Sequence, residues 1–215
     1  MLKNLSFGVS GCRTTEQAEA AKCFIDGLLE SLPAGSLQVW TDGSKLGRGT
    51  DGPTGAGALI HYTGDSDPSY KLSYHLGTST NQVAEIWAIG GALEQLEELG
   101  GVMGRLIHIF TDSKFTINCL TGVYQTHKHY SLTKLVLMLI RQLNIPPTNF
   151  HHVPGHVGIA KNEEADDLAK AGAQFSKDNN ETFNLHSIAT DYGFNHLKLE
   201  GNFFNHADDA DYCAS

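Results

Sequence analysis

The sequence predicts an α/β fold: a mixed five-stranded sheet, with an antiparallel meander followed by parallel strands, flanked by helices. Three strand-like runs between residues 36 and 76 are joined by short polar connections, which favours a meander. The nearly all-apolar run at 106–111 (L-I-H-I-F-T) is typical of a parallel strand buried on both faces. Helical and strand-like segments then alternate to residue 173, and these patterns together indicate helices packed on a sheet.

A helix is predicted before the sheet, over residues 14–32. Thr14 and Gln17 fit a capping box, and Pro33 follows the last turn. The apolar residues of the segment recur with helical spacing on one face: Ala18, Ala21, Phe24, Ile25, Leu28, Leu29 and Leu32. We interpret residues 1–35 as an N-terminal extension whose one amphipathic helix serves packing.

The meander begins with the run S-L-Q-V-W-T-D-G-S at 36–44, where residues alternate with the period of a strand. The run ends in the turn signal D-G-S, so Asp42 stands near the end of a central strand. The other two strands of the meander are predicted at 55–63 and 69–76.

The remaining elements follow from helical spacing and from short apolar runs. Helices are predicted at 81–99, 113–120, 130–143 and 162–173, and further strands at 106–111 and 149–153. Beyond residue 174 the composition changes: residues 177–215 carry two lysines and seven acidic residues, hence a net charge of −5. We expect 176–215 to be an acidic, partly ordered C-terminal extension. It either solubilises the domain or folds back to compete with a polyanionic substrate.

Composition limits the classes of function. A chain of 215 residues with 40% apolar residues suits one domain with appendages. The formal net charge of −9 argues against binding nucleic acid by bulk attraction, but it is compatible with an enzyme whose carboxylates are neutralised by metal ions. The four cysteines are scattered, and there is no apolar signal core or membrane-length apolar run. We expect an intracellular monomer, cytoplasmic or nuclear, that is not secreted and does not bind a membrane.

Four acidic residues stand in contexts suited to one metal centre. Asp42 and Asp112 each follow a strand, Glu85 lies early in a helix, and Asp166 lies in the last helix. If the first and fourth strands are neighbours, Asp42 and Asp112 lie side by side at one edge of the sheet. Oxygen-only ligands select Mg²⁺ or Mn²⁺, and two such ions about 4 Å apart can clamp an in-line displacement at phosphorus.

Four sequence blocks make this pattern specific. They are T-D-G-S (41–44), T-N-Q-V-A-E-I-W-A (80–88), T-D-S-K-F-T-I-N (111–118) and H-V-P-G-H-V-G-I-A-K-N-E-E-A-D-D-L-A-K-A-G-A (152–173). Together, in this order and spacing, they resemble type-I ribonuclease H, particularly its eukaryotic cellular and retroelement members. The resemblance covers residues 36–175, and it implies a catalytic domain with the RNase H-like fold. The implied reaction is metal-dependent endonucleolytic hydrolysis of the RNA strand of RNA–DNA hybrids, giving 5′-phosphate and 3′-hydroxyl ends.

The resemblance also implies roles for individual residues. Asp42, Glu85, Asp112 and Asp166 become ligands of two Mg²⁺ ions, with Mn²⁺ as a possible substitute, and His156 becomes a mobile histidine that assists proton movement and product release. Asp166 fits the family's N-E-x-x-D-x-L-A phrase better than its neighbour in the sequence does. Residues expected to touch the hybrid are Gly43, Ser44, Thr80, Asn81, Gln82 and Asn118.

Three departures from the family pattern concern substrate binding. The basic, Trp-containing protrusion of many cellular relatives is compressed here to residues 121–130. Val83 stands where relatives often carry a basic residue, and residues 1–35 contain no recognisable hybrid-binding domain. Each departure removes cationic contacts, so we expect weaker, more salt-sensitive and distributive binding.

Two alternative functions stay open at the level of sequence. One is a non-catalytic RNase H-like domain that binds or scaffolds nucleic acid and derives from a reverse transcriptase; the intact acidic residues argue against it. The other is a related nuclease that acts on DNA junctions or double-stranded RNA. Retention of the T-N-Q sequence at 80–82 argues against that second alternative.

Overall fold

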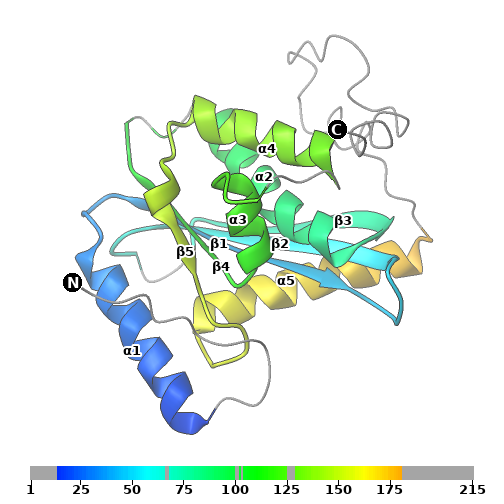
Figure 1. The fold of residues 1–215 in the computed structure, drawn as a ribbon, viewed down its shortest axis with the longest axis horizontal. Coiled ribbons are helices and arrows are strands. Elements are labelled where there is room, and N and C mark those ends of the chain that lie inside the picture. The colour runs from blue at the N-terminus through cyan, green and yellow to red at the C-terminus, as the bar shows by residue number, and fades with distance from the viewer. Residues whose placement is uncertain (1–13, 66–67, 100–101, 103, 125–128, 181–215) are drawn as a thin grey trace.

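The computed structural model describes residues 14–65, 68–99, 102, 104–124 and 129–180 (Figure 1). The strands are β1 (Leu37–Lys45), β2 (Gly52–Tyr62), β3 (Tyr70–Ser79), β4 (Ile107–Thr111) and β5 (Phe150–His152). The helices are α1 (Thr15–Ser31), α2 (Asn81–Glu98), α3 (Lys114–Leu120), α4 (Tyr130–Gln142) and α5 (Ala160–Asp178), with a 3-10 turn at Pro147–Asn149. Each predicted helix and strand is present, with ends that differ by a few residues.

The five strands form one mixed sheet in the order β3-β2-β1-β4-β5. β1 pairs antiparallel with β2, and β2 pairs antiparallel with β3, which is the predicted meander. β4 lies parallel to both β1 and β5. The predicted fold class is therefore confirmed, and so is the predicted contact between the first and fourth strands.

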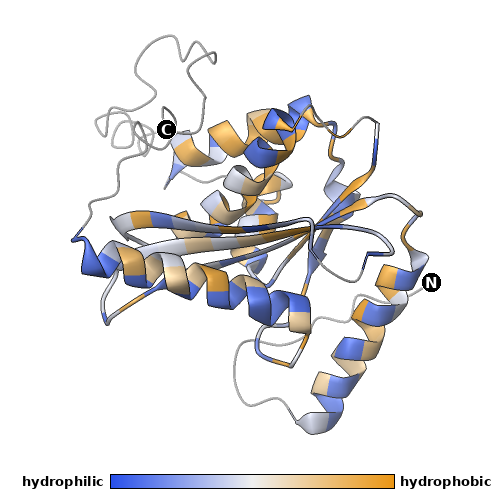
Figure 2. Cartoon of the chain, turned by 180° about the vertical axis from the view of Figure 1, so that it is seen from behind, coloured by the Kyte–Doolittle hydropathy of each residue, from blue (hydrophilic) through white to orange (hydrophobic). Residues whose placement is uncertain are grey.

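Helices cover both faces of the sheet. α2, α3 and α4 lie on one face, over the larger apolar core, which includes Leu37 and Val39 of β1 (Figure 1). α5 and α1 lie on the other face (Figure 2), where a smaller core holds Trp40 of β1 stacked on Phe110 of β4 with ring centroids 4.3 Å apart. Consecutive residues of β1 thus enter opposite cores, as strand geometry requires.

The N-terminal helix α1 forms as its sequence predicts. Thr14 and Gln17 make both hydrogen bonds of the capping box, which satisfy free N–H groups in the first turn. Ile25 is 1% exposed and packs in the smaller core. None of the described helices is long and apolar enough to cross a membrane.

The last helix is longer than predicted. The sequence indicated an end at Ala173, but α5 continues to Asp178, and Ser176 is buried against the sheet. The Ser176 hydroxyl donates to the Thr54 carbonyl at 2.8 Å and accepts from the Gly77 N–H at 3.0 Å. The change in composition after residue 174 therefore falls inside a packed helix. Most of the predicted acidic extension, residues 181–215, lies outside the described residues.

Close backbone contact sets the position of α5 on the sheet. A Cβ on Gly57 of β2 would overlap the Ala165 carbonyl oxygen and the Ala169 nitrogen of α5. Gly57 is also the antiparallel partner of Asp42. Because Gly57 has no side chain, α5 can lie directly against β2, the strand that pairs with β1 at Asp42.

We predict that Gly57→Ala lowers the free energy of unfolding by about 1–3 kcal/mol, because the added methyl group forces α5 away from β2. Chemical denaturation measures this change. Gly27→Ala in α1 is the matched control: a Cβ at Gly27 meets nothing within 4 Å, and alanine there should stabilise the helix by about 0.5–1 kcal/mol. Equal effects of the two substitutions would contradict the close-packing explanation.

Candidate active site

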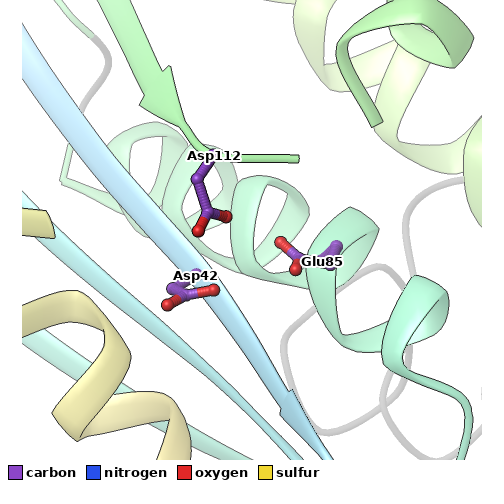
Figure 3. A group of neighbouring side chains, drawn as sticks. All are labelled: Asp42, Glu85 and Asp112. Atoms are coloured by element: carbon purple, nitrogen blue, oxygen red, sulfur yellow. The ribbon is translucent and has the colours of Figure 1, made fainter. Parts of the chain in front are cut away.

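Three of the predicted carboxylates gather at the end of the parallel strands. Asp42, Glu85 and Asp112 each offer one oxygen, and these three oxygens lie within 4.8 Å of one another. Figure 3 shows the three side chains converging from β1, from α2 and from the segment directly after β4. β1 continues to Lys45, so Asp42 lies inside the strand and residues 42–44 do not form the predicted turn. Thr41 and Thr111 are parallel partners, so Asp42 and Asp112, which directly follows β4, lie side by side.

Glu85 reaches this edge because α2 packs tightly on β1. A Cβ on Gly43 would overlap the backbone of Ala84 and Glu85, so only glycine fits at that position. Two hydrogen bonds orient the carboxylates: Gly43 N–H donates to Asp42 Oδ1 at 2.7 Å, and Asn81 Nδ2 donates to Glu85 Oε1 at 3.2 Å. Gly43 was predicted to approach a ligand, and here its near neighbour is the α2 backbone.

Burial and mutual repulsion disfavour negative charge in this cluster. Burial, reinforced by the nearby Asp112 and Asp166 carboxylates, raises the pKa of Asp42 to about 8. Burial, followed by repulsion from Asp42 and Asp112, also raises the pKa of Glu85 well above its usual range. The hydrogen bonds from Asn81 and Gly43 act in the opposite direction for Glu85 but do not cancel the effect. Without a cation, the cluster therefore holds protons that an exposed group would release.

The donor set fits a hard divalent cation. All three side chains present oxygen, which suits Mg²⁺ or Mn²⁺. Within the described part of the chain, Glu85 Oε2 is buried without a hydrogen-bond partner. A buried carboxylate oxygen is costly in that state, and a bound cation would satisfy it. The residues present can thus hold a metal ion.

Asp166 lies beside the cluster but is engaged elsewhere. Its Oδ2 accepts a hydrogen bond from Lys170 Nζ at 2.6 Å, one turn further along α5, and this bond raises the pKa of Lys170. His156 Nδ1 lies 3.9 Å from the same oxygen, and the His156 side chain is 77% exposed. The adjacent Asp167 is 80% exposed, which agrees with the choice of Asp166 as the inward-facing acid.

The residues predicted to touch the hybrid lie on β1, at the start of α2 and on α3. Thr80 is the N-cap of α2, and its hydroxyl accepts from the Val83 N–H at 3.2 Å. Asn81 is exposed at the first turn, and Gln82 and Ser44 are half-buried. Asn118 is half-buried on α3, where its carbonyl accepts from the Tyr124 N–H.

Three functional contacts were missed by the sequence reasoning. Asn81 supports Glu85, a contact that the i,i+4 spacing on a helix could have suggested. The same spacing could have paired Lys170 with Asp166. The third contact joins His129 Nε2 to the Thr80 hydroxyl at 3.4 Å. It connects positions 49 residues apart, and no local pattern predicts it.

Comparisons with known proteins agree with this geometry. A family model for RNase H matches residues 34–174, more than half of the chain. The chain belongs to the RNase H family. Human Ribonuclease H1 is 35% identical over 153 residues, covering 65% of this chain and 51% of that protein. Ribonuclease H from Thermosynechococcus vestitus is 30% identical over 141 residues, covering 61% of this chain and 85% of that protein. The chain thus spans about half the length of the human relative.

Solved RNase H structures share the fold. LC11-RNase H1, isolated from compost by a metagenomic approach, superimposes with a TM-score of 0.54 at 26% identity, covering 66% of this chain and 99% of that one. The same RNase H1 solved in complex with an RNA/DNA hybrid gives a TM-score of 0.56 at 25% identity, with the same coverage. The N-terminal RNase H domain of a Mycobacterium tuberculosis protein gives 0.57 at 25% identity, covering 68% and 99%.

Because the pKa of Asp42 is raised, the free energy of unfolding of the metal-free protein should depend on pH. Between pH 3.8 and about 8, the folded state holds a proton on Asp42 that the unfolded state has released. The free energy of unfolding therefore falls as pH rises through this window. Asp42→Asn should flatten this fall and leave the protein more stable than wild type at pH 8.

Thermal or chemical denaturation in a chelator at several pH values measures this effect. Asp167→Asn, which removes an exposed carboxylate, is the control and should keep the wild-type slope. Identical slopes for wild type and Asp42→Asn would show that Asp42 is not held protonated in the cluster.

Proposed function

We propose that this chain is a metal-dependent endoribonuclease that hydrolyses the RNA strand of RNA–DNA hybrids, leaving 5′-phosphate and 3′-hydroxyl ends. The observation that carries the proposal is the buried, oxygen-only cluster of Asp42, Glu85 and Asp112, with Glu85 Oε2 lacking a protein partner among the described residues. Membership of the RNase H family and the fold shared with a hybrid-bound RNase H1 support the same conclusion.

In this proposal the carboxylates hold two Mg²⁺ ions. Asp42, Glu85 and Asp112 would supply oxygen ligands as one group. Asp166, which lies near Asp42, would supply a further oxygen ligand. Bound cations supply positive charge that polarises the scissile phosphate and favours ionisation of the attacking water. Asn81 holds Glu85 in the orientation required for binding. Mn²⁺, with the same preference for oxygen, can replace Mg²⁺.

His156 and the start of α2 complete the proposed site. His156 stands on the solvent side of Asp166, where it can accept or deliver a proton and assist release of the product. The Thr80 hydroxyl contacts a phosphate of the DNA strand, and the Asn81 and Gln82 amides read the minor groove and the 2′-hydroxyl. Asn118 contacts a further phosphate, and Gly43 and Ser44 border the RNA strand.

Cleavage of a labelled RNA–DNA hybrid at low salt, in Mg²⁺ and in Mn²⁺, tests this function, beside duplex RNA, duplex DNA, a DNA junction and the two single strands. We expect cleavage of the RNA strand of the hybrid alone. Asp112→Asn should lower kcat by about 10²-fold or more, because it removes a cation ligand. Asp167→Asn, an exposed neighbour of the site, should keep wild-type activity.

A hybrid that stays intact at low salt in both Mg²⁺ and Mn²⁺ would reject the enzymatic proposal. If the chain still bound the hybrid, the function would be that of a non-catalytic nucleic-acid-binding domain. Cleavage of duplex RNA or of DNA junctions instead would reassign the substrate.

The ion pair between Lys170 and Asp166 affects how tightly a cation can bind beside Asp166. Because Lys170 Nζ already pairs with Asp166, a cation bound there must compete with it. Lys170→Gln should therefore reduce the Mg²⁺ concentration needed for half-maximal thermal stabilisation by about threefold, since exposed ion pairs contribute about 0.2–1 kcal/mol. Lys177→Gln, in the last turn of the same helix, serves as the charge-matched control. Unchanged Mg²⁺ dependence in Lys170→Gln would exclude the competition.

A further inference from the structure

The N-terminal helix α1 shares the smaller core with the residues at both ends of the loop that carries His156. Ile25 of α1 and Val153 are buried members of this core, and the partly buried Ile159 packs against it. Val153 and Ile159 directly flank the loop at 154–158. α1 ends before residue 34, where the match to the RNase H family begins. An element outside the matched region therefore supports a loop inside it.

The same loop touches the acidic cluster from its other side. A Cβ on Gly155 would overlap Asp112 Oδ2, so the loop backbone lies directly against that carboxylate. His156 follows with φ 54°, in the left-handed region that a residue with a side chain rarely adopts. Val157 is buried, at 8% exposed, and fixes the next position. The loop thus spans the distance between the cluster and α1.

A second contact connects α1 to the loop at its far end. Lys22 Nζ lies 2.7 Å from the position that a Cβ on Gly158 would occupy, and Lys22 Cε lies 3.1 Å from it. Gly158 has φ 78°, a backbone conformation that favours glycine, and Lys22 lies against the space that its missing side chain leaves. The half-buried Lys22 side chain covers the loop where it turns into α5.

We propose that α1 is a positioning element for the reaction: it holds the loop at 154–158 so that His156 stays beside Asp166. This inference rests on the proposed function of the site. The His156 side chain is exposed and its backbone conformation is unfavourable, so its position depends on the packing of the flanking residues. Val153 and Ile159 receive part of that packing from α1.

Two substitutions in α1 test the proposal in the full chain. Ile25→Ala removes the buried contact to the smaller core, and Lys22→Ala removes the surface contact to Gly158 without opening the core. Asp26→Asn, on the exposed side of the same helix, is the control and should match wild type. Each substitution is made in the wild-type chain and in a His156→Ala chain, and hybrid cleavage is measured below the melting temperature of every variant.

Because small displacements of a catalytic group are costly, we expect Ile25→Ala to lower kcat about tenfold and Lys22→Ala about threefold, with little change in KM. In the His156→Ala background both effects should disappear, since α1 acts through His156. The proposal would be overturned if Ile25→Ala and Lys22→Ala lowered kcat by the same factors in the His156→Ala chain as in the wild-type chain. It would also be overturned if they changed KM alone.

Hydrogen exchange of the backbone amides at 155–158 gives a readout that needs no activity. These amides should exchange about tenfold faster in Ile25→Ala than in wild type, while amides of β1 stay protected. If amides 155–158 exchanged at the same rate in Ile25→Ala as in wild type, α1 would not restrain the loop. This conclusion would hold even if the wild-type chain proved inactive. Failure of wild type to cleave the hybrid, with faster exchange in Ile25→Ala, would reject the proposed function alone.

Discussion

The crowding of buried carboxylates is the constraint on which the site depends. Asp42, Glu85 and Asp112 repel one another and lose solvation, so no local preference would bring them together. The fold has to hold them, and close backbone packing between its elements brings them together. Gly43 admits α2 against β1, and Gly57 admits α5 against β2. The energy of the surrounding cores thus maintains a site that favours a bound cation.

The position of the acids could be predicted from the sequence because it follows from topology. The carboxyl ends of parallel strands lie at the same edge of a sheet, so taking the first and fourth strands as neighbours places Asp42 and Asp112 together. Glu85 followed from a helix beginning near that edge. The capping box of Thr14 and Gln17 could also be predicted, because it depends on only four consecutive residues.

Local sequence patterns do not predict the other features, because these depend on contacts between distant segments. The way α5 is seated on its glycine contacts decides that Asp166 rather than Asp167 faces the cluster, and helical spacing alone leaves that choice open. The extension of α5 to Asp178 depends on Ser176 bonding to two separate strands, whereas the change in composition suggested an earlier end. Support of the His156 loop by α1 joins segments more than 120 residues apart, and only the folded chain brings them together.

We propose that the buried cluster binds a divalent cation between its three carboxylates. Anomalous diffraction from crystals grown with Mn²⁺ and the RNA–DNA hybrid tests it most directly, because it locates the ion independently of any activity. We predict an anomalous peak among Asp42, Glu85 and Asp112 that is lost in crystals of Asp42→Asn. A Mn²⁺-saturated crystal with no peak at this position, or with Mn²⁺ only at exposed acids, would contradict it.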